Sequence, residues 1–241
     1  MSRSTTGCQR LEAFITVRNM TSHAAAPAVL LPRLDEPTPV LLMNTIWADR
    51  SGVHDALTTP SELSAWLKAV GHRLFSGGDR AAATIRAIDV DEFRRLRTAL
   101  RRLAAELTHD TRPRALTSIE GQDPEWAASL LNTVSAAAPS APTMQWPERV
   151  AQLSPPAGVR PPVAALAAIA GTAVGLLAAP DSPQLRACQA PGCVLYFVKD
   201  HPRREWCSAA CGNRARAARH YRRHRGARGP ASRASHGPHH S

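Results

Sequence analysis

The stretch CQAPGCVLYFVKDHPRREWCSAAC, residues 188–211, holds four of the five cysteines of this 241-residue chain. The cysteines form two close pairs, with four residues inside the first pair, three inside the second and thirteen between the pairs. Each pair can bring two thiolates to one side of a metal ion, and the loop between them folds back to supply the other side. The spacing therefore predicts one structural zinc ion, bound by Cys188, Cys193, Cys207 and Cys211.

Other interpretations of this cysteine cluster stay open. Disulfide bonds are one, although clustered cysteines in a cytoplasmic chain are more often metal ligands. His201 lies between the two pairs and is an alternative ligand, although four sulfurs already complete a tetrahedral site. Zinc is preferred to an iron–sulfur cluster because two pairs followed by a helix suit a closed structural site. Four thiolates leave no open coordination position, so we do not expect a catalytic metal. The sequence of the body shows no phosphate-binding glycine loop, no nucleophile elbow and no paired histidines, so we do not expect an enzyme.

The residues around the cysteines predict a β-hairpin followed by a helix. Val194 to Val198 form a β-prone run, residues 199–202 can turn the chain, and Glu205 with Trp206 can pair back as a short strand. Ser208 can cap a helix that starts at the second cysteine pair. The sequence thus predicts a treble-clef or ribbon-like zinc finger, in which a β-hairpin is joined to a basic helix.

Positive charge is concentrated at the C-terminal end of the chain. Of the net charge of +11, +10 arises from residue 184 onward, where eleven arginines and Lys199 stand against Asp200 and Glu205. The first 183 residues are nearly neutral. A neutral body with a strongly basic end is the asymmetry expected of a protein that meets a polyanion.

The basic helix has almost no apolar face with which to pack. Apart from Tyr221 and a few alanines, residues 214–225 are arginine and other polar residues, so the natural partner is a nucleic-acid backbone. A merely soluble tail in an arginine-rich chain is the alternative. The candidate nucleic-acid contacts are Arg214, Arg216, Arg219, Arg222, Arg223 and Arg225.

The rest of the chain reads as a mainly α body. Apolar residues at helical spacing predict helices at 40–50, 58–71, 90–108, 124–137 and 163–179. The arginines at 94, 95, 97, 101 and 102 are interpreted as a solvated helix face. The proline-rich segment 139–162 is expected to be a loop with at most a short strand. The uncharged helix at 163–179 is short and alanine-rich for a membrane span, so we interpret it as a buried core helix.

These patterns divide the chain into four parts, with no secretory signal at its start. The expected parts are a flexible N-terminal extension (1–35), a helical domain (36–182), the zinc finger with its basic helix (183–225) and a disordered tail (226–241). Cys8 lies in the extension without a partner. Histidines 236, 239 and 240 in the tail could bind metal adventitiously.

Two groups of residues resemble known families. WCSAACGNRARAARHYRRHR at 206–225 and CQAPGCVLYF at 188–197 resemble the CGNR zinc finger, named for the four residues from Cys211 to Arg214. VLLMNTIWADR at 40–50 and LTTPSELSAWLKAVG at 57–71 are similar to the ABATE domain that accompanies this finger. The resemblance implies a regulator of transcription under stress.

Together these observations predict a cytoplasmic, zinc-dependent, DNA-binding regulator of transcription, associated with the nucleoid when bound. RNA binding is the alternative, because arginine-rich helices also suit RNA. A small-molecule-binding helical domain with a structural finger is a third hypothesis. A small-molecule effector and a homodimer are open possibilities for the body, and no membrane association is expected.

Overall fold

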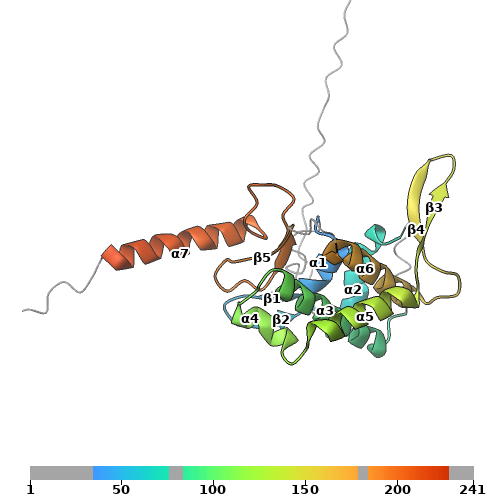
Figure 1. Cartoon of the computed structure of the whole chain (residues 1–241), viewed down its shortest axis with the longest axis horizontal. Coiled ribbons are helices and arrows are strands. Elements are labelled where there is room, and N and C mark those ends of the chain that lie inside the picture. The colour runs from blue at the N-terminus through green and yellow to red at the C-terminus, as the bar shows by residue number, and fades with distance from the viewer. Residues whose placement is uncertain (1–34, 76–83, 179–183, 228–241) are drawn as a thin grey trace, which may run out of the picture.

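The computed structural model describes residues 35–75, 84–178 and 184–227, and these parts are mainly α-helical (Figure 1). The predicted extension and tail lie outside the described residues, except for residues 35, 226 and 227. The helices of the body are α1 (Thr38–Met43), α2 (Pro60–Val70), α3 (Ala87–Leu107), α4 (Pro113–Leu116), α5 (Pro124–Ala137) and α6 (Pro161–Ala178). Single 3-10 turns follow α2 at Gly71–Arg73 and α4 at Thr117–Ile119.

Two predicted helix starts are confirmed by their caps. Before α2, the Thr59 hydroxyl accepts the backbone N–H of Glu62 (3.2 Å), and the Glu62 carboxylate accepts the N–H of Thr59 (2.9 Å). This reciprocal pair satisfies two N–H groups that a helix start leaves free. Before α5, the Asp123 carboxylate accepts the N–H of Trp126.

The body packs its helices around one apolar core. Helix α3 contributes Phe93, Leu96 and Leu100, and it contacts α1, α5 and α6. Helix α6 is long and apolar enough to cross a membrane by length and composition alone, but half of it is buried against the other helices. The interpretation of α6 as a core helix therefore agrees with its packing.

The predicted helix at 40–50 is wrong beyond Met43. The chain instead forms an antiparallel hairpin of β1 (Ile46–Ala48) and β2 (Val53–Asp55). The Asp49 carboxylate accepts the N–H of Ser51 and closes the turn (2.8 Å). The helix ends because Asn44 turns its side-chain amide to the backbone of Tyr196 far along the chain.

The proline-rich segment is more regular than the sequence indicated. It forms a second hairpin of β3 (Ala141–Gln145) and β4 (Val150–Ser154), which projects from the body on the side opposite helix α7 (Ala209–Ala227; Figure 1). The sequence predicted a loop with at most a short strand in this segment, and not a hairpin of two strands.

Candidate metal centre and nucleic-acid interface

The hairpin of the finger pairs differently from the prediction. Strand β5 (Leu185–Ala187) precedes the first cysteine and pairs antiparallel with β6 (Tyr196–Val198). The expected strand at 205–206 is wrong: that edge of β6 is met by the Arg204 side chain, which donates to the Val198 carbonyl (2.7 Å). Between the strands, the N–H of Cys193 donates to the carbonyl of Ala190 (3.0 Å) and forms a tight turn.

The four cysteines of the motif converge in one buried cluster. All four Sγ atoms lie within 4.8 Å of one another, with Cys193 and Cys207 3.8 Å apart and Cys207 and Cys211 3.4 Å apart. Four sulfurs bound tetrahedrally at the usual Zn–S length of about 2.3 Å would be separated by about 3.8 Å. A disulfide bond would require two sulfur atoms about 2.05 Å apart. The cluster therefore fits one zinc ion, and all four residues are free cysteines.

Helix α7 begins at the metal centre. The Ser208 hydroxyl accepts the N–H of Cys211 (3.2 Å), as the predicted cap requires, and Arg214 donates to the Cys211 sulfur (3.0 Å). Hydrogen bonds with the neighbouring thiols, that of Cys188 first, hold the pKa of Cys211 below its ordinary value. The same thiol contacts raise the pKa of Cys207, and zinc binds the thiolate form of cysteine.

Side chains near the motif have partners inside the finger. Arg214 is exposed and donates to the Cys211 sulfur, and its contact with nucleic acid stays a prediction. Asn213 accepts a hydrogen bond from Arg216. His201 stays in the turn, where its ring accepts the N–H of Arg203 (3.1 Å).

A guanidinium group from the body is hydrogen-bonded to the loop that carries the first cysteine pair. Arg112 donates to three carbonyl oxygens, those of Cys188 (2.8 Å), Cys193 (3.2 Å) and Leu195 (3.1 Å). Asp110 holds the other edge of the same guanidinium (2.6 Å) and also accepts the hydroxyl of Tyr196 (2.8 Å). The geometry of the cysteine loop therefore depends on residues some 80 positions earlier in the chain.

Arg101 makes a second link between body and finger. It is fully buried and donates to the carbonyls of Met43 (3.0 Å), Ala115 (3.3 Å) and Val194 (3.2 Å), while its guanidinium lies over the Tyr196 ring. Burial lowers its pKa to about 10, which still leaves it charged at neutral pH.

The prediction that the arginine face of α3 is solvated is therefore wrong for two of its residues. Arg101 is buried as above, and Arg97 is also buried in a two-point ion pair with Asp55 (2.6 Å at each contact). Arg94 and Arg95 are exposed, in agreement with the prediction. The sequence carried no local signal for the buried pair, because their partners are carbonyls, hydroxyls and one carboxylate of other segments of the chain.

The finger hairpin also shares the apolar core of the body. Leu185, Ala187 and Tyr196 belong to the same buried cluster as the helices of the body. At the edge of this junction, Glu36 accepts the N–H of Val198 (2.9 Å) and forms a buried ion pair with Arg204. In the described residues, finger and body are thus packed together, although a boundary near residue 182 stays a prediction.

Helix α7 leaves this packed region and projects away from it (Figure 1). Arg219, Arg222 and Arg223 are exposed, and within the described residues none of the three has a hydrogen bond or ion pair. Arg216 is also exposed and is paired only with Asn213. Arg225 lies on the same helix, which the sequence predicted to end there and which continues to Ala227.

Four cysteines that can hold one zinc ion, at the start of a projecting basic helix, define a zinc-finger protein. Its form is that of zinc fingers that bind nucleic acid. Residues 184–224 match the CGNR zinc finger, and residues 36–180 match the ABATE domain, described as "Putative stress-induced transcription regulator". The chain belongs to the ABATE family and carries a CGNR zinc finger. No curated protein matches it.

Proposed function

We propose that this protein is a zinc-dependent, DNA-binding regulator of transcription. The observation that carries the proposal is the exposed outer part of α7, where Arg219, Arg222 and Arg223 have no partner among the described residues. Such guanidinium groups suit phosphate oxygens, and neutralising phosphates releases counterions from the nucleic acid. The family description and the basic end of the chain support the same conclusion.

Zinc has a structural part in this proposal. Bound by Cys188, Cys193, Cys207 and Cys211, the ion would fix the start of α7 relative to the cysteine loop and so aim the helix. Four cysteine ligands leave no place for a substrate, so we do not assign an enzymatic activity to the metal.

Fluorescence anisotropy with the zinc-loaded full chain tests the proposal. We expect binding to labelled duplex DNA that is lost on chelation and restored when zinc is added back. Equal binding with and without zinc would contradict it. Structured RNA is the competing ligand, and preferential displacement of DNA by RNA would favour the RNA-binding alternative. Of the aromatic residues that could stack on RNA, Tyr196 and Phe197 are buried and Trp206 is partly exposed.

The body offers a place for a small-molecule effector. A hollow of about 440 Å³ opens between α3, α5 and α6, with Glu92 and Arg95 beside Trp126, Val163 and Leu166. An effector there would contact three core helices at once. A screen of metabolites for a shift in the melting temperature of the full chain tests this role, and conversion of any hit would indicate an enzyme instead. Cytoplasmic location and a homodimer stay predictions.

A further inference from the structure

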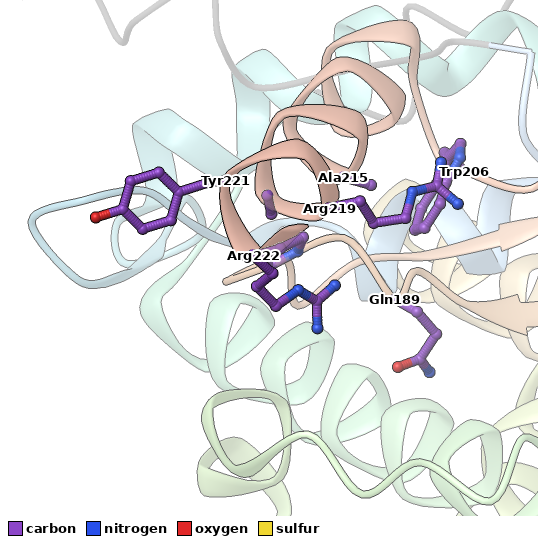
Figure 2. Close-up of a pocket in the computed structure, with 8 residues that line it drawn as sticks. Gln189, Trp206, Ala215, Arg219, Tyr221 and Arg222 are labelled. Atoms are coloured by element: carbon purple, nitrogen blue, oxygen red, sulfur yellow. The ribbon is translucent and has the colours of Figure 1, made fainter. Parts of the chain in front are cut away.

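A second hollow lies beside the metal centre, between α7 and the loop of the first cysteine pair (Figure 2). Its volume is about 450 Å³. Figure 2 shows Arg219 reaching toward Trp206, with Arg222 on the same side of the helix and Tyr221 pointing away. The residues that line the hollow are Gln189, Pro191, Trp206, Ala215, Ala218, Arg219, Tyr221 and Arg222.

The hollow is lined by hydrogen-bond donors that have no acceptor in the described parts of the protein. Within the described residues, the guanidinium groups of Arg219 and Arg222, the indole N–H of Trp206 and the side-chain amide of Gln189 have no hydrogen-bond partner. No acidic side chain lines the hollow. Arginine and the indole can only donate, so the ligand that completes this site must be an acceptor with negative charge.

Trp206 is held firmly enough to act as a fixed donor. It directly precedes the metal-centre residue Cys207, and its ring lies against the backbone of α7 at Gly212. A Cβ atom at Gly212 would lie 3.1 Å from the indole Cδ1, so any larger residue there would push the ring away by a few tenths of an ångström. The second residue of the CGNR motif therefore positions the indole at the side of the hollow.

We propose that this hollow seats one backbone phosphate of the bound nucleic acid, held between Arg219 and Arg222 and accepting the indole N–H of Trp206. The two arginines lie three positions apart on α7, so both can reach one anion. Contacts to phosphate fix the register of a protein on its nucleic acid. The inference rests on the proposed nucleic-acid binding and adds a particular anchoring site to it.

The substitution Trp206→Phe separates this anchor from general electrostatic attraction. The substitution removes one N–H donor and leaves the net charge of the protein unchanged. We therefore expect the affinity for the bound nucleic-acid strand to fall about tenfold at every salt concentration. The slope of log affinity against log salt should stay the same. The double variant Arg219→Ala with Arg222→Ala should instead flatten that slope by about 0.9, because the shared phosphate is then no longer neutralised. Trp146→Phe, on the exposed β3–β4 hairpin, is the matched control and should bind as the wild type does.

A scan with the unmodified protein keeps the test independent of folding. Each phosphate of the bound strand is replaced in turn by an uncharged methylphosphonate. One position should weaken binding far more than the others, and at that position the loss should not add to the loss from Trp206→Phe. Equal losses at all positions, or full additivity, would overturn the anchor while leaving nucleic-acid binding intact. Absence of any binding by the wild type would overturn the proposed function as well.

Free phosphate is the other source of the same chemistry. Inorganic phosphate is added as a competitor and compared with sodium chloride at equal ionic strength. We expect no displacement of the strand beyond the effect of chloride. Displacement by phosphate well beyond that of chloride, lost in Trp206→Phe, would assign the hollow to a free anion and overturn the strand anchor.

Discussion

Helices α3 and α7 both carry arginines at short spacing, yet the structure uses them in opposite ways. On α3, Arg97 and Arg101 are buried and donate to carboxylate and carbonyl oxygens of distant segments. On the outer part of α7, Arg219 and Arg222 are exposed and have no partner among the described residues. The first pair joins the finger to the body, and the second pair is available to a ligand.

The difference lies in which acceptors surround each helix. Around α3, the chain supplies carbonyl groups at Met43, Ala115 and Val194 that have been withdrawn from water. Burying a charge is tolerated only when such partners satisfy it. Helix α7 projects from the body (Figure 1), and no described residue accepts a hydrogen bond from Arg219, Arg222 or Arg223. Substitutions on α3 should therefore change stability, and substitutions on outer α7 should change binding.

The metal centre lies between the two regions, and its loss should have the largest effect. In the double variant Cys207→Ser with Cys211→Ser, we expect bound zinc to fall from one ion per chain to none and the melting temperature to drop steeply. Structural zinc contributes about 10–16 kcal/mol in isolated finger peptides. Elemental analysis and thermal unfolding measure both. Cys8→Ser is the control, and a double variant that keeps its zinc would contradict the assignment.

Substitution of Arg101 should have the second-largest effect on stability. Arg101→Met leaves the carbonyls of Met43, Ala115 and Val194 without their donor, so we expect the free energy of unfolding to fall by about 3–5 kcal/mol. The neighbouring Arg102 pairs only with exposed Glu106 (2.7 Å), and Arg102→Met should change stability by about 0.5 kcal/mol or less. Denaturant titration compares the two. Similar losses in both variants would remove the distinction between buried and exposed arginines on α3.

Asp110 should have a smaller, pH-dependent effect. Burial alone would raise its pKa, but hydrogen bonds from Arg112 and Tyr196 outweigh this and hold the pKa below the ordinary 3.8. A lowered pKa means that the carboxylate stabilises the fold above the unfolded pKa and loses this effect as pH falls through the folded one. The stability difference between wild type and Asp110→Asn should therefore be constant from about pH 5 to 7 and shrink below about pH 4. A difference that grows toward acid would contradict the pairing.

The smallest change in stability should come from α7. In the triple variant Arg219→Ala, Arg222→Ala and Arg223→Ala, we expect the free energy of unfolding to stay within about 0.5 kcal/mol of the wild type. Alanine favours helix, and within the described residues none of the three arginines has a hydrogen bond or an ion pair to lose. Denaturant unfolding of the zinc-loaded proteins measures this. A loss of several kcal/mol would show that these side chains stabilise the fold, as those of α3 do.

Local signals in the sequence were enough for the helices with clear caps and for the cysteine cluster. The Thr59–Glu62 box acts within three residues, so it is visible without the fold, and the Asp123 cap is equally local although it was not predicted. The four cysteines predicted their own convergence because their spacing matches the geometry of one ion. The capping serine of α7 was predicted on the same local grounds.

Long-range partners explain what the sequence did not reveal. The helix predicted at 40–50 ends early because Asn44 binds Tyr196, which lies 152 positions away. Strand β6 pairs with β5, before the first cysteine, rather than with residues after the turn. Arg101 was interpreted as part of a solvated face and Arg112 was not singled out, because both donate to backbone carbonyls, which every residue has and no motif marks.

The salt dependence of DNA binding tests the central claim most directly. For the wild type and the triple α7 variant, the logarithm of the affinity constant is measured against the logarithm of salt concentration, with both proteins zinc-loaded. If Arg219 and Arg222 share one phosphate and Arg223 neutralises a second, the slope of the variant should be shallower by about 1.8. Parallel lines for the two proteins would contradict the claim that these arginines meet the nucleic-acid backbone.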